Sequence, residues 1–383
     1  MSKTVAIIVA GGSGLRAGGG VPKQFAGIAG RSLVDHAVTS FRSHPLVDAV
    51  VVVVPAGRED AVASLVPAAG RVVVGGATRR ESVASGLAAA EALGGARILV
   101  HDAARPFIPA AVIDRVLAAL DVHDGATPAL PVADTLARGD GSLGEVVSRA
   151  GLHRIQTPQG FRTSALRAAH ADWPREAEAT DDAQMVRRLG GSVAVVQGDP
   201  MLEKITYAED FAAAEARLDW ETRTATGFDV HRLEEGEELW LGGVLIQHER
   251  GLSGHSDADV ALHALTDALL GTVAAGDIGT HFPPNDPQWK GASSDRFLQH
   301  AASLIAERGG RIGFVDLTLI CESPKIGPHR AAMTARIAEL LDLAPDRVSV
   351  KATTTERLGF TGRGEGIAAQ AVATVRLPGA LPA

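Results

Sequence analysis

The stretch VAIIVAGGSGLR, residues 5–16, decides the fold expected for the first half of the chain. An apolar run typical of a buried strand, Val5–Val9, leads directly into a glycine-rich loop that ends on Pro22-Lys23-Gln24. Glycines allow backbone N–H groups to crowd around a phosphate, and Arg16 and Lys23 add positive charge. The loop is a candidate triphosphate cradle, although a flexible turn with solvated charges would share its composition, and its spacing matches neither a Rossmann fingerprint nor a Walker loop.

Runs rich in Val and Ile recur through the first half, separated by Ala- and Leu-rich stretches with helical spacing. The runs lie at Val5–Val9, Val47–Val54, Arg71–Val74, Arg97–Val100 and Val193–Val196. This alternation predicts an α/β unit with a parallel sheet covered on both faces. Ligands of such sheets bind at the carboxyl ends of the strands, so chemistry is expected in the loops that follow these runs.

The predicted strands and helices of the second half of the chain follow a different order. We expect a helix over Phe211–Trp220 and a polar stretch at Glu221–Thr224, which places the boundary near Arg223 and gives domains 1–223 and 224–383. The elements expected beyond it are strands at Thr226–Val230, Arg311–Ile320, Val348–Thr353 and Gly366–Val375, a hairpin at Leu239–Ile246, and helices at Ser256–Ala275, Ser294–Arg308 and Pro328–Leu341. This order predicts an α+β domain with helices layered on one sheet.

Length and charge limit the classes of function. At 383 residues the chain is longer than the roughly 250–300 residues at which a single core stops growing, so two domains are expected. Hydrophobic residues make up 46% and charged residues 21%, which predicts a chain folded throughout. The net charge of −8 argues against a nucleic-acid or anionic-membrane binder, which needs surplus Lys and Arg.

Several features indicate the cytoplasm. Apolar runs such as Ala49–Val54 are far shorter than the roughly 20 residues of a membrane helix. Met1–Lys3 lead straight into a strand-like segment, which leaves no room for the regions of a signal peptide. The single cysteine, Cys321, excludes an internal disulfide, and we expect it to have no covalent role, although a lone thiol can be a nucleophile.

Charged and polar motifs follow the predicted strands of the first half. His101-Asp102-Ala103-Ala104-Arg105-Pro106 comes directly after the strand Arg97–Val100, so a carboxylate and a guanidinium lie where such sheets bind substrate. Further motifs are Pro131-Val132-Ala133-Asp134-Thr135, Arg149, Gln156-Thr157-Pro158-Gln159, Thr180-Asp181 and Lys204-Ile205-Thr206.

In this order, these motifs and the glycine-rich loop resemble the 2-C-methyl-D-erythritol 4-phosphate cytidylyltransferase family over residues 3–222. The resemblance implies a nucleotide-binding, Rossmann-like α/β fold and transfer of CMP from CTP, with Mg²⁺ bridging the phosphates and pyrophosphate released. It implies that Arg16, Lys23 and Lys204 are catalytic and bind the triphosphate. The implied substrate contacts are Gly11 and Gly12 in the loop, Gly76 and Ser82 on the cytidine, and Asp102, Arg105, Thr135, Arg149 and Thr157 on methylerythritol phosphate. In-line displacement at phosphorus depends mainly on positioning and charge, so no protein nucleophile is needed.

Ligand-type residues gather in the second half. Asp229 and His231 are two apart on a predicted strand and therefore share a face. His263 lies in the first half of the helix that follows Gly254-His255-Ser256-Asp257-Ala258-Asp259. An Asp-His-His set with an open fourth position is typical of catalytic zinc, whereas scattered histidines are more often ordinary residues. Asp267, four residues after His263, is placed to orient that imidazole.

The remaining motifs of this half are Gly276-Asp277-Ile278-Gly279, Pro324-Lys325 and KATTTERLGFTGRGEG at residues 351–366. With them, residues 225–377 resemble the 2-C-methyl-D-erythritol 2,4-cyclodiphosphate synthase family. The resemblance implies attack of a substrate 2-phosphate on its β-phosphate with release of CMP. It implies Zn²⁺ on Asp229, His231 and His263, and Mg²⁺ or Mn²⁺ on catalytic Glu356. The implied substrate contacts are His255 and Ser256 on the 2-phosphate, Asp277 on the erythritol hydroxyls, Lys325, Thr353 and Thr354 on the cytidine diphosphate, and additionally Gly279, Phe360 and Arg363.

The two resemblances together predict a multifunctional enzyme of isoprenoid biosynthesis, a nucleotidyltransferase joined to a lyase. They imply a homo-oligomer, a trimer or a hexamer, and possible association with the kinase that acts between the two reactions. Two alternatives stay open at this point. The first half could transfer another nucleotide to another sugar phosphate, and the second could be a zinc-stabilised trimerisation module, against which Glu356, Lys325 and Asp277 argue.

Overall fold

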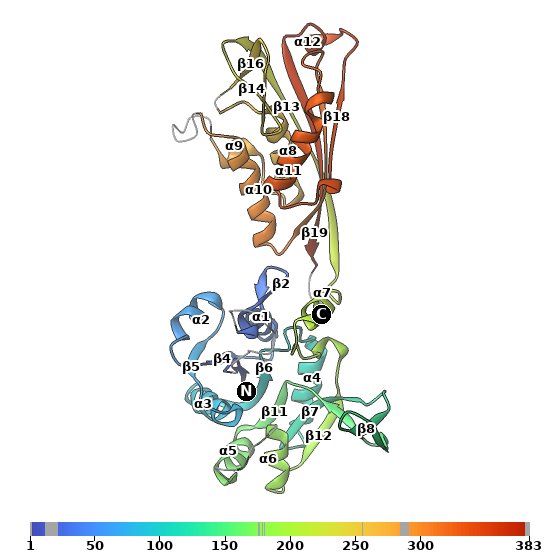
Figure 1. Ribbon diagram of the computed structural model, residues 1–383. Coiled ribbons are helices and arrows are strands. Elements are labelled where there is room, and N and C mark those ends of the chain that lie inside the picture. The colour runs from blue at the N-terminus through green and yellow to red at the C-terminus, as the bar shows by residue number, and fades with distance from the viewer. Residues whose placement is uncertain are drawn as a thin grey trace. The chain divides into compact units, whose positions relative to one another are not determined.

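The computed structural model describes residues 2–11, 22–174, 177, 179, 181–254, 256–283 and 291–379. The chain forms two compact units, of which the first ends at Leu218 and the second covers Asp219–Gly379. Figure 1 colours them along the sequence, and each is described by itself below. Within these described ranges no helix is both long enough and apolar enough to span a bilayer.

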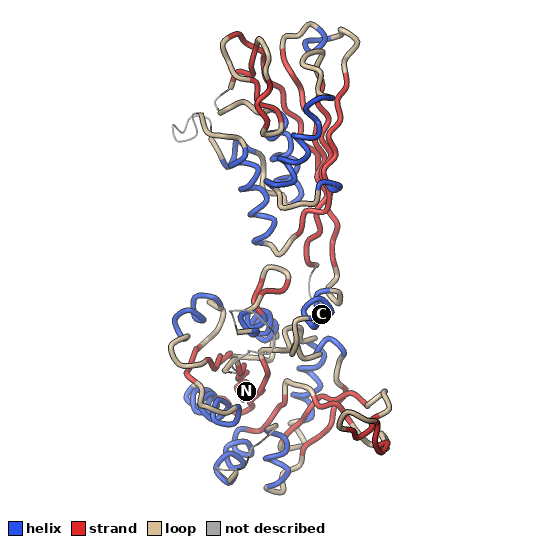
Figure 2. Tube along the Cα trace, in the orientation of Figure 1, coloured by secondary structure: helices blue, strands red, loops and turns tan. Residues whose placement is uncertain are grey.

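The first unit is built on an eight-stranded mixed sheet in the order β10-β7-β11-β6-β1-β4-β5, with β12 beside β7 (Figure 2). Its strands are β1 (Lys3–Val9), β4 (Ala49–Val54), β5 (Arg71–Val74), β6 (Gly95–Asp102), β7 (Gly125–Pro131), β10 (His153–Ile155), β11 (Gln159–Arg162) and β12 (Val193–Gln197). The central strand β1 pairs in parallel with β4 on one side and with β6 on the other. The carboxyl ends of these three strands therefore meet at one edge of the sheet.

Helices cover both faces of this sheet. They are α1 (Leu33–Ser43), α2 (Glu59–Leu65), α3 (Arg79–Ala92), α4 (Ala110–Ala119), α5 (Thr163–Asp172), α6 (Asp182–Arg188) and α7 (Glu209–Glu215). Alternation along β1 sends Ala6 and Ile8 into a core with α1, α2 and α4, and Val5 and Ile7 into a core with α3, α5 and α6. This two-sided burial explains why the strand is apolar at every position from Val5 to Val9.

The predicted strands of this unit are confirmed, but the prediction of an all-parallel sheet is wrong. Strands β10 and β11 pair antiparallel with β7, and β11 also pairs antiparallel with β6. The sequences of β7, GATPALP, and β11, QGFR, lack the Val and Ile runs that marked the other strands. Smaller elements are η2 (Lys23–Phe25), η3 (Pro200–Leu202) and the hairpins β2 (Gly27–Ile28) with β3 (Arg31–Ser32) and β8 (Leu136–Gly139) with β9 (Leu143–Val147).

The second unit is a five-stranded sheet in the order β16-β13-β19-β17-β18. Its strands are β13 (Trp220–Glu235), β16 (Arg250–Ser253), β17 (Arg311–Ile320), β18 (Val348–Thr353) and β19 (Gly366–Pro378), with the separate hairpin β14 (Leu239–Leu241) and β15 (Val244–Ile246). Its helices are α8 (Val260–Thr272), α9 (Ile278–His281), α10 (Asp295–Glu307), α11 (Arg330–Leu340) and α12 (Gly359–Gly362), with η5 (Gly327–His329) and η6 (Pro345–Arg347). The expected α+β class is confirmed.

The helix predicted over Phe211–Trp220 is shorter than expected, because α7 ends at Glu215. Trp220 instead begins β13, where it pairs with Pro378 of β19. The guanidinium carbons of Arg311 and Arg376 lie 5.5 and 5.1 Å from its ring centroid. Cation–π contacts and strand pairing thus hold this segment extended, and the expected polar stretch after it belongs to the strand.

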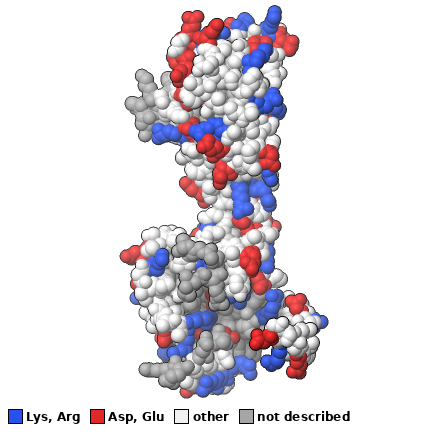
Figure 3. All heavy atoms as spheres, viewed as in Figure 1, with Lys and Arg blue, Asp and Glu red and all other residues white. Residues whose placement is uncertain are grey.

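Helices α8, α10 and α11 cover one face of the second sheet and share a single core with it (Figure 1). The register of β13 against β19 places Asp229 opposite Ala369 and His231 opposite Ile367, both in that core, so the two predicted ligands point toward the helices. The other face, which we call the open sheet face, carries Phe228, 60% exposed, with the partly exposed Phe314 and Val230. On the side of the molecule drawn in Figure 3, acidic and basic side chains are interspersed.

Candidate active sites

Asp102, at the carboxyl end of β6, lies at the centre of a charge cluster in the first unit. Its Oδ2 is 2.7 Å from Lys204 Nζ and its Oδ1 is 3.2 Å from Arg79 Nε. Arg79 Nη1 reaches a second carboxylate, Asp182, at 2.7 Å. Burial would raise the pKa of Asp102, but the opposite charges of Arg79 and Lys204 outweigh burial and hold it well below its usual range.

Thr157 and Arg105 join the same cluster through His101. The backbone N–H of Asp102 donates to Thr157 Oγ1 at 3.2 Å. His101 Nε2 donates to the carbonyl of Arg105 at 2.9 Å, so its Nδ1 accepts from Thr157 Oγ1 at 3.0 Å. His101 is fully buried, and this burial lowers its pKa to about 4. A neutral imidazole therefore fixes the strand end that carries Asp102 and Arg105.

The two catalytic lysines predicted from opposite ends of the first domain come together. Lys23 Nζ donates to the carbonyl of Ile205 at 2.8 Å, and Ile205 follows Lys204 directly. Arg105 donates through Nη1 to Leu202 just before this segment and through Nη2 to Ile155 at 3.4 Å. Burial is the main reason that the pKa of Arg105 is lowered. The structure thus gathers cations from three distant segments at one edge of the sheet.

Three residues expected at the loop and the nucleotide also meet. A Cβ at Gly11 would lie 3.1 Å from Ser82 Oγ, and that hydroxyl donates to the carbonyl of Gly76 at 3.4 Å. A Cβ at Gly76 would lie 2.2 Å from Glu81 Cβ, so no larger residue fits this backbone. The packing is fixed by the start of α3, where Thr78 and Glu81 cap the helix reciprocally.

Two expected contacts lie elsewhere, and others are outside the described residues. Thr135 and Arg149 lie at the base of the β8–β9 hairpin, where Arg149 donates to the carbonyl of Ala133. Within the part of the chain that the structure describes, neither side chain bonds to Asp102, Arg105 or Thr157. The expected site residues that fall outside the described residues are Gly12, Arg16 and His255.

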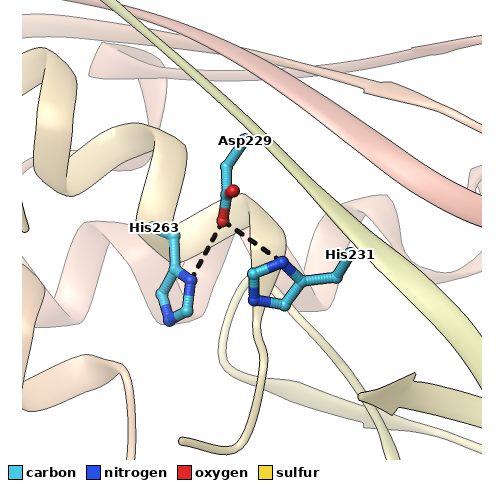
Figure 4. Close-up of side chains that lie close together, drawn as sticks. All are labelled: Asp229, His231 and His263. Atoms are coloured by element: carbon cyan, nitrogen blue, oxygen red, sulfur yellow. Dashed lines mark hydrogen bonds and ion pairs between the residues drawn. The ribbon is translucent and has the colours of Figure 1, made fainter. Parts of the chain in front are cut away.

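In the second unit Asp229, His231 and His263 converge as the sequence predicted (Figure 4). Their ligand-type atoms all lie within 4.8 Å of one another. Asp229 Oδ2 is 3.0 Å from His263 Nδ1 and 3.5 Å from His231 Nδ1. A tetrahedral zinc with bonds near 2.0–2.1 Å separates its ligand atoms by roughly 3.3 Å. The two separations that involve Asp229 are close to this value, so the three residues are compatible with a small divalent ion.

Hydrogen bonds fix the orientation of the His263 ring. Its Nε2 is 2.9 Å from Ser294 Oγ, and that hydroxyl donates to Asp257, so Ser294 accepts the Nε2 proton. Its Nδ1 lies 3.0 Å from Oδ2 of Asp229, so one ring nitrogen points to Ser294 and the other to Asp229. Burial would raise the pKa of Asp229, but the hydrogen bond with His263 and the charge of His231 lower it overall. The residues present fit a divalent metal.

Ser256 and Asp267 have different relations to His263. Ser256 Oγ lies 3.2 Å from His263 Nε2, so this expected substrate contact adjoins the metal ligands. The prediction that Asp267 orients His263 is wrong, because its Oδ1 instead accepts from the backbone N–H of Ile278 at 2.8 Å. Spacing of four residues placed Asp267 on the right helix face, but Ser294, which no local spacing marks, takes the ring nitrogen.

The nucleotide-binding motifs expected in this unit follow two neighbouring strands. Strands β17 and β18 are parallel, with Ile320 opposite Thr353, so Lys325 and Thr354 lie in adjacent loops at one edge of the sheet. Thr354 Oγ1 donates to Glu356 Oε1 at 2.9 Å. Glu322, which the sequence did not single out, accepts at one oxygen from the backbone N–H groups of Thr355 and Arg357, both at 3.1 Å.

The last expected contacts lie near these elements. Asp277 caps α9 and accepts from the amide and hydroxyl of Thr280 at 2.8 and 2.7 Å, and these bonds lower its pKa. Gly279 lies within α9, Phe360 within α12, and Arg363 makes a two-bond ion pair with Glu365. Cys321 is buried, and burial raises the pKa of its thiol to about 11, as expected for a thiol with no covalent role.

Comparison with known proteins covers the whole chain. The model of the 2-C-methyl-D-erythritol 4-phosphate cytidylyltransferase family matches residues 4–220, and that of the YgbB family matches residues 222–376. The bifunctional enzyme IspD/IspF of Rhizorhabdus wittichii is 62% identical over 97% of each chain, and that of Novosphingobium aromaticivorans is 57% identical over 97% of this chain and 96% of its own. The structure of the bifunctional IspDF from Campylobacter jejuni matches 98% of this chain and 99% of its own, with 34% identity and a TM-score of 0.51.

The boundary between the two matched segments also separates the two candidate sites. A sheet edge with clustered cationic side chains lies in the first matched segment, and a candidate metal centre lies in the second. The chain belongs to the family of bifunctional IspD/IspF enzymes of isoprenoid biosynthesis, with an N-terminal cytidylyltransferase domain and a C-terminal cyclodiphosphate synthase domain.

Proposed function

We propose that residues 1–223 transfer CMP from CTP to 2-C-methyl-D-erythritol 4-phosphate. The substrate phosphate attacks the α-phosphorus of CTP, and pyrophosphate leaves. The observation that carries this proposal is that Lys23 bonds to the segment that carries Lys204, whose ammonium bonds to Asp102, although 181 positions separate the two lysines in sequence. Two ammonium groups at one sheet edge neutralise the charge that develops on the phosphates, and Arg16 is proposed to assist them.

In this reaction the remaining residues hold the two substrates. Gly11, Gly12, Gly76 and Ser82 are proposed to surround the nucleotide, since Ser82 lies next to both Gly11 and Gly76. Asp102, Arg105 and Thr157 are proposed to hold methylerythritol phosphate, because His101 ties them into one rigid unit. Thr135 and Arg149 would complete this contact from the β8–β9 hairpin, and Mg²⁺ would offset the charge of the bound phosphates.

We propose that residues 224–383 close a cyclic diphosphate. The 2-phosphate of 4-diphosphocytidyl-2-C-methyl-D-erythritol 2-phosphate attacks its β-phosphate, and CMP leaves. Zn²⁺ held by Asp229, His231 and His263 would polarise the β-phosphoryl group, and Glu356 would hold Mg²⁺ or Mn²⁺. His255 and Ser256 are proposed to position the 2-phosphate, and Asp277 with Gly279 the erythritol hydroxyls. The proposed cytidine diphosphate contacts are Lys325, Thr353, Thr354, Phe360 and Arg363.

The open sheet face supports a homo-oligomer. Phe228, Val230 and Phe314 form exposed apolar surface on a sheet whose other face packs against α8, α10 and α11. Apolar surface of this kind typically marks an interaction site. We propose that copies of the chain meet there as a trimer, or as a hexamer if the first domains also pair. The cytoplasmic location and an association with the kinase of the intermediate step stay predictions.

The test uses the purified full chain. CTP, methylerythritol phosphate and Mg²⁺ are supplied and pyrophosphate is followed; the separately phosphorylated product is then supplied with Zn²⁺ and CMP is followed. Lys23→Ala should lose only the first release and His263→Ala only the second, so each variant is the control for the other. Pyrophosphate without CMP would reduce the second domain to a scaffold, and turnover with UTP, GTP or ATP in preference to CTP would overturn the nucleotide assignment.

A further inference from the structure

Arg79 is the first residue of α3, and it makes a bridge between the buried carboxylate of Asp182 and the partly buried carboxylate of Asp102. Its Nε is 3.2 Å from Asp102 and its Nη1 is 2.7 Å from Asp182. The side chain of Asp182 is only 1% exposed, and its second oxygen accepts from His170 Nε2 at 3.0 Å. Arg79 is therefore fixed from both sides, by the capped start of α3 and by α5 and α6.

Lys204, the second partner of Asp102, is held much less firmly. Its side chain is 44% exposed, against 26% for Arg79, and it follows the short helix η3. Each cation takes a different oxygen of Asp102. Lys204 can therefore swing from Asp102 to a bound phosphate while Arg79 stays in place.

The difference between the firmly held Arg79 and the more exposed Lys204 matters for the charge of Asp102. If Lys204 left an otherwise unpaired Asp102, a carboxylate that is 14% exposed would lose its only counter-charge and would take up a proton or move. The charged groups around Asp102 are Arg79 from α3, Lys204 from the segment after η3, and Arg105 and His101 from its own loop and strand. Arg105 is directed to backbone carbonyls and His101 is neutral, so Arg79 is the cation that remains bonded to Asp102.

We propose that Arg79 is a positioning residue of the cytidylyl transfer, which keeps Asp102 in place and ionised while Lys204 moves between Asp102 and the triphosphate. This inference rests on the proposed function of the first domain. It assigns a role in the reaction to a residue that touches no substrate atom, and it explains why a guanidinium is needed: two nitrogens in a fixed fork reach two carboxylates, which one ammonium cannot do.

The test compares Arg79→Gln with two matched controls. Asp182→Asn removes the ion pair of Arg79 with Asp182 but leaves its ion pair with Asp102. Arg97→Gln, also on β6, removes an exposed ion pair of 2.8 Å with Asp121. Arg79→Gln should lower kcat/KM for methylerythritol phosphate roughly 10–100-fold, as lost partners of buried charges do. Both controls should stay within a few-fold of the unaltered chain.

The pH dependence separates positioning from simple stabilisation. Without Arg79 the pKa of Asp102 rises, so the activity of Arg79→Gln relative to the unaltered chain should fall further between pH 8 and pH 5, while the two control ratios stay flat. Thermal midpoints should fall alike in Arg79→Gln and Asp182→Asn. Equal pH ratios for those two variants would overturn the inference. If the unaltered chain releases no pyrophosphate, the proposed function fails instead, and crystals of Arg79→Gln then decide: a displaced Asp102 supports the inference and an unmoved one refutes it.

Discussion

Replacing Glu322 by Ala should selectively damage the second active site by loosening the loop that carries Glu356. Glu356 and Arg357 have φ values of 52° and 63°, and each such residue costs on the order of 1–2 kcal/mol. The loop therefore holds about 2–4 kcal/mol of strain. Against it, one oxygen of Glu322 accepts two backbone N–H groups, and bonds to a charged acceptor contribute about 1.5–3 kcal/mol each.

The loss can be estimated from these two numbers. Glu322 is half-buried, so the lower figure applies, and its removal withdraws about 3 kcal/mol from a loop under similar strain. The ordered loop then falls to roughly 1% of the population, since 1.4 kcal/mol is about a factor of ten and 3 kcal/mol about a factor of one hundred. Apparent affinity falls with the competent fraction, so binding of Mn²⁺ at Glu356 should weaken about 100-fold.

The assay is a Mn²⁺ titration of the zinc-loaded chain, followed by electron paramagnetic resonance and by CMP release. Pyrophosphate release by the same polypeptide is the internal control and should not change. Glu322→Gln keeps a carbonyl acceptor of the same length, so it should stay within a few-fold of the original affinity. If Glu322→Ala binds Mn²⁺ as tightly as the unaltered chain, the loop does not depend on this carboxylate and the reasoning is wrong.

Three further outcomes are expected. Chelation followed by gel filtration should abolish CMP release, whereas pyrophosphate release should be kept once Mg²⁺ is returned. Zn²⁺ should restore CMP release in the unaltered chain but not in His263→Ala. Restoration in both would contradict the proposed ligand set. Burial lowers the pKa of His101 from 6.5 to about 4, so as the pH falls below 6.5 the unfolded chain binds a proton that the folded chain does not bind. The free energy of unfolding of the first unit should therefore be highest above pH 6.5 and fall by about 3 kcal/mol toward pH 4. Urea denaturation of His101→Gln should show a smaller fall with pH, and parallel curves for the two proteins would contradict the prediction. Gly76→Ala would place Cβ 2.2 Å from Glu81 Cβ and should raise KM for CTP roughly tenfold or more. In the control Gly27→Ala the new Cβ would meet nothing nearer than 3.9 Å, so KM for CTP should not change. Equal KM values for the two variants would refute the packing argument.

Elements with strong periodicity could be predicted from the sequence. Val50–Val54 lies in a strand buried on both faces, and its unbroken apolar run marks it. Asp229 and His231 could be paired because side chains two apart on a strand share a face whatever lies around them. These predictions needed only local geometry, which follows directly from the spacing of residues in the sequence.

Contacts between distant segments could not be predicted in this way. The partner of His263 was expected four residues away at Asp267, but it is Ser294, 31 positions along the chain. Arg79 reaches Asp182 across 103 positions and Glu322 reaches Arg357 across 35. No spacing rule connects such residues, because the topology of the sheet and not the period of a helix or strand brings them together. The strand β7 was missed for a different reason, since its two prolines and its lack of Val and Ile hide a buried strand.

The pairing of β13 with β19 runs without a break from Trp220 opposite Pro378 to Arg232 opposite Gly366. Loss or gain of a single codon between Trp220 and Asp229 would turn Asp229 and His231 together to the open sheet face, unless the whole pairing slipped by the same step. An exchange of one side chain in that segment leaves both ligands where they are. The candidate metal centre therefore tolerates substitutions along this stretch better than insertions or deletions.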